Sequence, residues 1–195
     1  MIETRTLPAD TDLLALHRRA PTRYPLLLES VASGTTHGRW DLLLAGNGEG
    51  LRLDPDGIVR DLGGLEIEGA ACKGDFLGAL DVQWQAQRIA REEPRWPFRG
   101  GWALLLDYEL AAQVEPVLEL AQRADAQPSA VALRCPAAVL RDRNTGDCVA
   151  VAEVGHADLL ERIAADLAAF PPAPPAWQAP VRIDEDAPDE FLHGV

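Results

Sequence analysis

A glycine pair followed by a short apolar run constrains the fold more than any other feature of this sequence. The stretch 97–110 contains Gly100 and Gly101, which allow the backbone to turn or to pack closely where a Cβ atom would clash. Residues 102–106 are all apolar and too few for an ordinary helix, so they predict a strand that is buried on both faces. Asp107 follows as the expected N-cap of a short helix. The stretch therefore predicts a turn, a core strand and the first turn of a helix.

Other apolar runs predict strands in the first third of the chain. Residues 24–30 and 39–45 are expected strands, and Pro25 should lie at the start of its strand or at a sheet edge. The turn sequence Asp-Pro-Asp-Gly at 54–57 lies between alternating apolar residues and predicts a β-hairpin. Because no crossover helix intervenes, residues 39–62 are expected to form a meander of antiparallel strands.

Two more strands are predicted later in the chain, at 131–140 and 148–152, and a turn at 143–147 joins them. Pro136 lies inside the first of these strands. Since proline has no backbone N–H to donate, its presence predicts a bulge or an edge position there.

Apolar residues at helical spacing predict three longer helices. The first covers 10–18 with Asp10 as its N-cap, the second covers 75–91 with Asp75 as its N-cap, and the third covers 157–170. Together with the strands, these helices predict an α+β fold of antiparallel sheets flanked by helices.

Composition and charge exclude several classes of partner and site. The chain has 195 residues and a formal net charge of −13 at pH 7, with no basic patch, which argues against nucleic acid and anionic membranes as partners. Its apolar runs are far too short to span a membrane. Cys72, Cys135, Cys148 and the four histidines lack metal-ligand spacing, so we expect reduced thiols in a cytoplasmic protein and no metal site.

The last residues predict a change in organisation. The sequence Pro-Pro-Ala-Pro-Pro at 171–175 is expected to form a stiff, extended linker. We therefore expect one domain over 1–170, a Pro-rich linker over 171–183, and the truncated start of a further domain over 184–195, where a capped helix begins and stops after a few residues.

Four sequence strings, taken in order, resemble a known family. They are Tyr24–Ser30, Gly38–Ala45, Pro97–Trp102 with Asp107–Leu110, and Pro128–Ala132. In this order they resemble the N-terminal region of component I of the chorismate-utilising enzymes, which include aminodeoxychorismate (para-aminobenzoate) synthase and anthranilate synthase. The resemblance covers roughly residues 20–170. The strings Arg-Trp-Asp-Leu at 39–42 and Pro-Phe-Arg-Gly-Gly at 97–101 are more similar to aminodeoxychorismate synthase than to its anthranilate relative.

The resemblance implies a β-sandwich-like pair of antiparallel sheets flanked by helices. It also implies that chorismate chemistry and Mg²⁺ belong to a C-terminal domain that this chain lacks. The complete component, with a glutamine amidotransferase partner that supplies ammonia, would convert chorismate to 4-amino-4-deoxychorismate for folate synthesis. The 195-residue chain alone is then expected to be inactive, with no catalytic residue, metal or cofactor of its own.

The resemblance further implies a tryptophan pocket in this region. The matching positions are Leu28, Glu29, Ser30, His37, Arg39 and Trp40. Ser30 and neighbouring backbone groups would hold the ammonium or carboxylate of the amino acid, while Trp40 and Leu28 would cover its indole ring. A purely structural interpretation stays open, with Ser30 as an edge hydroxyl and Trp40 as core. Two other functions also stay open: the regulatory domain of anthranilate synthase, and a free-standing aromatic amino acid sensor.

The apolar runs at 26–28, 42–45 and 102–106 predict strands that need cover on both faces. The three predicted helices are enough to cover one face. We therefore expect an exposed apolar patch larger than is usual for a monomer.

Overall fold

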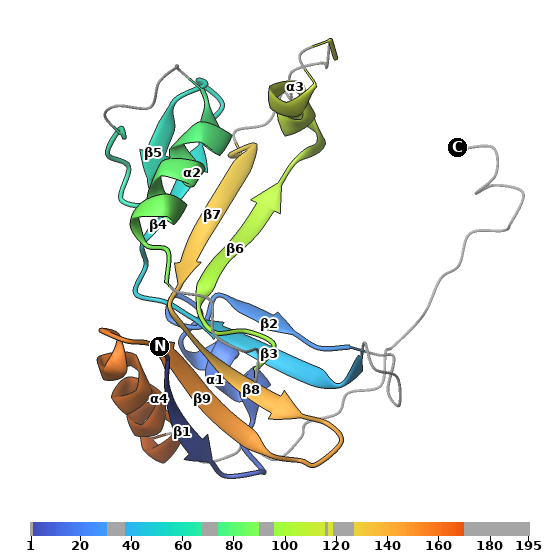
Figure 1. Cartoon of the computed structure of the whole chain (residues 1–195), viewed down its shortest axis with the longest axis vertical. Helices are drawn as coiled ribbons and strands as arrows, with labels where there is room; N and C mark the ends of the chain where they lie inside the picture. Colours follow the sequence, from blue (N-terminus) through green and yellow to red (C-terminus); the bar gives the residue numbers. More distant parts are fainter. Residues whose placement is uncertain are drawn as a thin grey trace, which may run out of the picture.

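The fold consists of two antiparallel sheets with helices packed against them (Figure 1). The computed structural model describes residues 2–30, 38–67, 74–89, 96–115, 117–118 and 127–169. Within these residues, one sheet has five strands in the order β1-β9-β8-β3-β2, and the other has four in the order β5-β4-β7-β6. The predicted α+β fold with antiparallel sheets and flanking helices is confirmed.

The five-stranded sheet is packed against two helices. Its strands, in spatial order, are β1 (Ile2–Leu7), β9 (Cys148–Glu153), β8 (Ala137–Asp142), β3 (Trp40–Ala45) and β2 (Leu26–Leu28). The helices α1 (Leu13–Arg19) and α4 (Ala157–Ala169) bury Leu16, Leu159 and Ile163 against one face of this sheet. As predicted, Pro25 immediately precedes an edge strand, β2.

The four-stranded sheet is packed against α2 (Phe76–Ala86). Its strands are β5 (Val59–Asp61), β4 (Gly50–Leu53), β7 (Ala130–Cys135) and β6 (Gly101–Leu106). After β6 come a 3₁₀ turn, η2 (Tyr108–Leu110), and the short helix α3 (Ala111–Val114). Phe76 and Ala79 of α2 are buried in one cluster with Leu51 and Ala132 of the sheet.

Pro136 separates two strands that the sequence predicts as one. The segment 131–140 divides into β7 and β8, which are inner strands of the two different sheets. Pro136 therefore lies at the passage between sheets, and the prediction of a bulge or an edge position was wrong. The physical reason is that proline ends the ladder of backbone hydrogen bonds on one side of the chain.

The predicted meander over 39–62 was also wrong. β3 pairs with β2 and β8, whereas β4 pairs with β5 and β7 in the other sheet. The hairpin inside this range is confirmed, because the Gly57 N–H donates to the Asp54 carbonyl at 2.9 Å and β4 pairs with β5.

Two predicted helix starts, at Asp75 and Asp107, agree with the structure, and one, at Asp10, shifts by two residues. Asp75 caps α2 as predicted, since its Oδ1 accepts from the Gly78 N–H at 2.7 Å, although the helix ends at Ala86 and not at 91. α1 is capped by Asp12 and not by Asp10, because the Asp12 Oδ1 accepts from the Ala15 N–H at 2.9 Å. Asp107 stands at the N-cap position of η2 without a side-chain cap hydrogen bond.

A buried ion pair joins the two sheets. Arg134 of β7 and Glu153 of β9 are each 5% exposed and form a salt bridge. The Arg134 guanidinium also donates to the Gly101 carbonyl at 2.8 Å and to the Gln87 side-chain oxygen just after α2. Gly100 lies so close that a Cβ atom there would overlap the Glu153 carboxylate, which confirms the close packing predicted for the glycine pair. We call Arg134, Glu153, Gly101, Gln87 and Gly100 together the inter-sheet joint.

Apolar surface stays exposed on two of the three predicted runs. Leu104, Leu105 and Leu106 of β6 are 50%, 68% and 45% exposed, so the prediction that this strand is buried on both faces was wrong. β6 is an edge strand, and α2 does not cover it fully. Leu26 and Leu28 of β2 are also exposed. Apolar side chains are therefore uncovered at these two strands, and an apolar patch larger than is usual for a monomer stays a prediction.

The run at 42–45 is covered on both faces. Leu43 packs in the core under α1 and α4, while Leu44 packs on the opposite face of the sheet in a cluster that includes Trp96 and Phe98. Trp96 and Phe98, in the segment that precedes β6, therefore cover the face of β3 that α1 and α4 leave open.

Several predictions concern the ends of the chain and its thiols. Cys135 and Cys148 are buried and free, as expected for structural thiols, and burial raises the pKa of both. Three other predictions lie outside the described residues. They concern Cys72, the domain boundary near 170, and the segments 171–183 (linker) and 184–195. In the described part of the chain, we find no helix that is both long and apolar enough to cross a bilayer.

Candidate functional site

The candidate site lies where β2 and β3 end next to the β8–β9 turn. Leu28 pairs with Leu42 across the β2–β3 ladder, and Trp40 pairs with Asp142 across the β3–β8 ladder. Directly paired residues share a face of a sheet, and so do residues two apart on one strand. Leu28, Trp40 and Asp142 therefore lie on one face, with Leu28 44% exposed at the edge.

Aromatic and cationic groups surround Trp40 on this face. The Trp96 ring meets the Trp40 ring edge to face, with centroids 6.1 Å apart and an interplanar angle of 80°. The Arg39 guanidinium carbon lies 4.9 Å from the Trp40 centroid, within the range of a cation–π interaction. The half-buried indole thus has an aromatic ring and a positive charge as its neighbours.

The charge of Arg39 is balanced by a buried carboxylate. The Arg39 Nε donates to Asp142 Oδ2 at 2.9 Å, and a second guanidinium nitrogen also contacts this oxygen. The Asn144 backbone N–H donates to Asp142 Oδ1 at 2.9 Å. These hydrogen bonds, that of Arg39 first, lower the pKa of Asp142 below its ordinary value. Asp142 therefore holds Arg39 at the rim of the site as an ion pair.

A second arginine ties the end of β2 to the same corner. The Arg143 Nε donates to Asp41 Oδ1 at 2.7 Å, and another nitrogen of its guanidinium donates to the carbonyl of Ser30. The Arg143 backbone N–H donates to the carbonyl of Arg39 at 2.8 Å. Asp41 is only 2% exposed, so this buried carboxylate positions Arg143, which in turn positions Ser30.

The other end of β2 is anchored to α4. Tyr24 is fully buried, and its hydroxyl donates to Asp166 Oδ2 at 2.7 Å. Burial and this hydrogen bond raise the pKa of Tyr24 above its ordinary value. Arg23 also forms a salt bridge with Asp166. The short edge strand that carries Leu28 is thus held at both ends by side-chain contacts.

Of the six residues predicted for the pocket, five come together at this corner: Leu28, Glu29, Ser30, Arg39 and Trp40. His37 lies outside the described residues. The prediction missed Asp41, Asp142 and Arg143. Two signals in the sequence point to them: a carboxylate within the apolar run 39–45, and the charged string Arg-Asp-Arg at 141–143 directly after an apolar strand.

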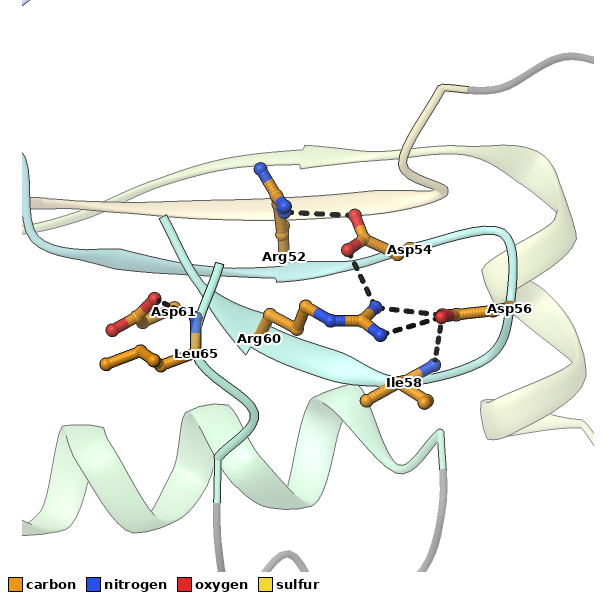
Figure 2. Close-up of polar contacts among 7 residues, drawn as sticks. All are labelled: Arg52, Asp54, Asp56, Ile58, Arg60, Asp61 and Leu65. Carbon is orange, nitrogen blue, oxygen red and sulfur yellow. Dashed lines mark hydrogen bonds and ion pairs between the residues drawn. The ribbon is translucent and has the colours of Figure 1, made fainter. Parts of the chain in front are cut away.

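A second polar cluster, on the four-stranded sheet, has a structural role. Figure 2 shows Arg60 between two carboxylates: it donates to Asp54 Oδ2 at 2.8 Å and to Asp56 Oδ2 at 2.7 Å. Asp56 also accepts from the Ile58 N–H, and Arg52 pairs with Asp54 at 3.0 Å. Arg52, Asp54, Asp56 and Arg60 each have an opposite charge beside them, while Asp61 accepts from the Leu65 N–H at 2.8 Å. The four paired charges therefore fasten the β4–β5 turn.

The corner around Trp40 has the chemistry of a binding site for a small amphipathic molecule. It combines exposed and half-buried apolar side chains with a paired arginine and a serine at its rim. Among the described residues, no group of three or more His, Cys, Asp or Glu side chains could hold a metal ion. Aromatic amino acids match this combination of an apolar ring and a charged head.

Comparisons with known proteins identify the fold. No protein-family model and no curated protein matches the chain. Among solved structures, the fold is similar to that of anthranilate synthase component I from Streptococcus pneumoniae TIGR4, with a TM-score of 0.53 and 15% sequence identity. The similarity covers 85% of this chain and 36% of that chain, so the present chain spans about a third of the length of that synthase. The two antiparallel sheets and their helices therefore form an α+β fold similar to that of part of anthranilate synthase component I.

Proposed function

We propose that the chain is the N-terminal domain of a chorismate-utilising synthase component I, and specifically of aminodeoxychorismate synthase. The observation that carries this proposal is the similarity of fold over 85% of the chain to part of anthranilate synthase component I. The sequence strings at 39–42 and 97–101 support the aminodeoxychorismate branch, and the anthranilate branch is the alternative.

In this proposal the domain is not catalytic by itself. A C-terminal domain would bind chorismate with Mg²⁺, and a glutamine amidotransferase would supply ammonia to it in the cytoplasm. The product would be 4-amino-4-deoxychorismate. The present domain would contribute a scaffold and the corner around Trp40 as a binding site for an aromatic amino acid.

The branch of the family is tested with the complete protein that contains this domain. Incubated with chorismate, ammonium and Mg²⁺, it is expected to form 4-amino-4-deoxychorismate, which chromatography separates from anthranilate. The 195-residue chain assayed in parallel should form neither product. Anthranilate as the product would move the protein to the other branch, and the absence of both products from the complete protein would contradict the proposal.

We infer that tryptophan is the ligand of the corner around Trp40. Its indole would lie against Leu28 and Trp40, which share a face of the sheet. Its charged head would lie beside Ser30, whose carbonyl Arg143 holds in place, and near the Arg39–Asp142 pair. A cation and a carboxylate at the rim match the two charges of an amino acid.

Calorimetry with tryptophan tests this pocket. We expect binding in the micromolar range, weakened tenfold or more by Ser30→Ala, because a lost hydrogen bond to a charged group is worth about 1.5–3 kcal/mol. Ser129→Ala, which makes the same change next to β7 in the other sheet, should leave the affinity unchanged. No heat of binding at millimolar tryptophan would leave the corner with a purely structural role.

A further inference from the structure

The edge strand β6 differs in chemistry from the other sheet edges. β1 carries Glu3 and Arg5, β5 carries Arg60 and Asp61, and β2 is only three residues long. Charged residues and short length are the usual protection of edge strands against pairing with another chain. β6, with the sequence Gly-Trp-Ala-Leu-Leu-Leu, has six residues and neither charge nor proline. It is therefore the edge most suited to accept another strand.

The backbone of β6 presents a regular set of donors and acceptors on its outer side. The Asp107 N–H donates to the Ser129 carbonyl at 2.9 Å, so the backbone groups of this residue point toward β7. In an antiparallel strand this direction alternates from one residue to the next. The N–H and C=O groups of Trp102, Leu104 and Leu106 must therefore point away from β7. In the described part of the chain, no strand pairs with them.

We propose that a second copy of this chain pairs with this edge, β6 antiparallel to β6, with Leu104 opposite Leu104 of the second copy. In this register Trp102 lies opposite Leu106 of the second copy, so all three outward-facing residues make backbone hydrogen bonds. The two four-stranded sheets become one sheet of eight strands. Such a contact is two-fold and occupies both β6 edges, so it stops at a dimer and does not extend into a filament.

Side chains on one face of β6 give this pairing an apolar core. A groove of about 270 Å³ lies between α2 and β6, lined mainly by Leu77, Leu80, Trp84, Trp102 and Leu104. In the proposed register, Leu106 of the second copy lies next to Trp102 at this groove. On the opposite face, Leu105 lies over Ala103 of the second copy, a small residue that leaves room for it. The contact would bury the exposed leucines of β6.

Charges at the ends of β6 are complementary in an antiparallel pair. Arg99 precedes the strand, whereas Asp107 and Glu109 follow it. Antiparallel pairing brings Arg99 of each copy toward the acidic end of the other copy. The net charge of −13 on each chain opposes association, but at physiological ionic strength charges are screened over about 8 Å, and the strand itself carries none. Local complementarity therefore favours a second copy as the occupant.

Sedimentation equilibrium of the 195-residue chain tests the dimer. We expect twice the 21.1 kDa mass of one chain at micromolar concentration. Leu104→Glu should give a monomer, because it places two like charges opposite each other at the two-fold axis. Leu65→Glu is the matched control, since Leu65 is 73% exposed near the opposite edge of the same sheet, and this variant should stay dimeric. Thermal melts should show that both variants are folded.

A charge-pairing experiment tests the register. Leu104→Glu and Leu104→Lys should each be monomeric alone, and an equimolar mixture should regain the mass of a dimer, since Glu then faces Lys. A wild-type chain that is monomeric, including one that associates only after another polypeptide is added, would overturn the proposal. A dimer that Leu104→Glu does not weaken, or a mixture that stays monomeric, would overturn it as well. These outcomes do not depend on chorismate or tryptophan, so they are separate from the proposed function.

Discussion

Replacing Glu153 with Leu is expected to destabilise the protein by about 3–5 kcal/mol, the usual cost of removing one partner of a buried ion pair. Arg134 would stay in the inter-sheet joint, 5% exposed, with its charge uncompensated. The side chain has little freedom to escape, because its other nitrogens bond to Gly101 and Gln87. Urea denaturation, followed by the midpoint of unfolding, measures the loss.

Two further variants separate the cost of leaving the Arg134 charge unpaired from the cost of replacing a glutamate with leucine. Glu161→Leu makes the same change at an exposed pair with Arg5, and it should cost about 1 kcal/mol or less. The double variant Arg134→Met with Glu153→Leu should be more stable than Glu153→Leu alone, because the uncompensated charge is gone. If Glu153→Leu cost no more than Glu161→Leu, the ion pair would not be what holds the sheets together.

Gly100→Ala is expected to have an effect of similar size, about 4 kcal/mol, for two reasons that add. The φ angle of Gly100 is +101°, a conformation that costs an L-residue about 1–2 kcal/mol. The added Cβ atom would also overlap the Glu153 carboxylate, and overpacking typically costs about 1–3 kcal/mol. The same denaturation experiment measures the total.

Gly155→Ala is the matched control for the backbone contribution. Gly155 has a φ angle of +95°, but a Cβ atom there would meet nothing within 4 Å. This variant should therefore lose only about 1–2 kcal/mol, the cost of the left-handed conformation. Equal losses for the two variants would show that the space beside Glu153 is not limiting at Gly100.

The candidate site was partly visible in the sequence. Leu28, Ser30, Arg39 and Trp40 were predicted from two strings by a resemblance to a family, and the structure places them at one corner. Asp142 and Arg143 were missed because their importance depends on pairing with residues about 100 positions earlier in the chain. No local sequence pattern indicates which strands are neighbours in a sheet.

The elements themselves were largely determined by local sequence. The Asp-Pro-Asp-Gly turn, the Asp75 cap and the apolar spacing of α4 each act within a few residues, so the sequence alone was enough to predict them.

The division into two sheets was decided only by the tertiary structure. The run 131–140 looks continuous because strand propensity carries no information about a strand's partner. Its first half, β7, pairs with β4 and its second half, β8, pairs with β3, and both partners are far away in the chain. Exposure of β6 was likewise decided by which face α2 covers, and not by the apolar run itself. An apolar run predicts that a strand needs cover, but whether that cover is present depends on packing between distant segments.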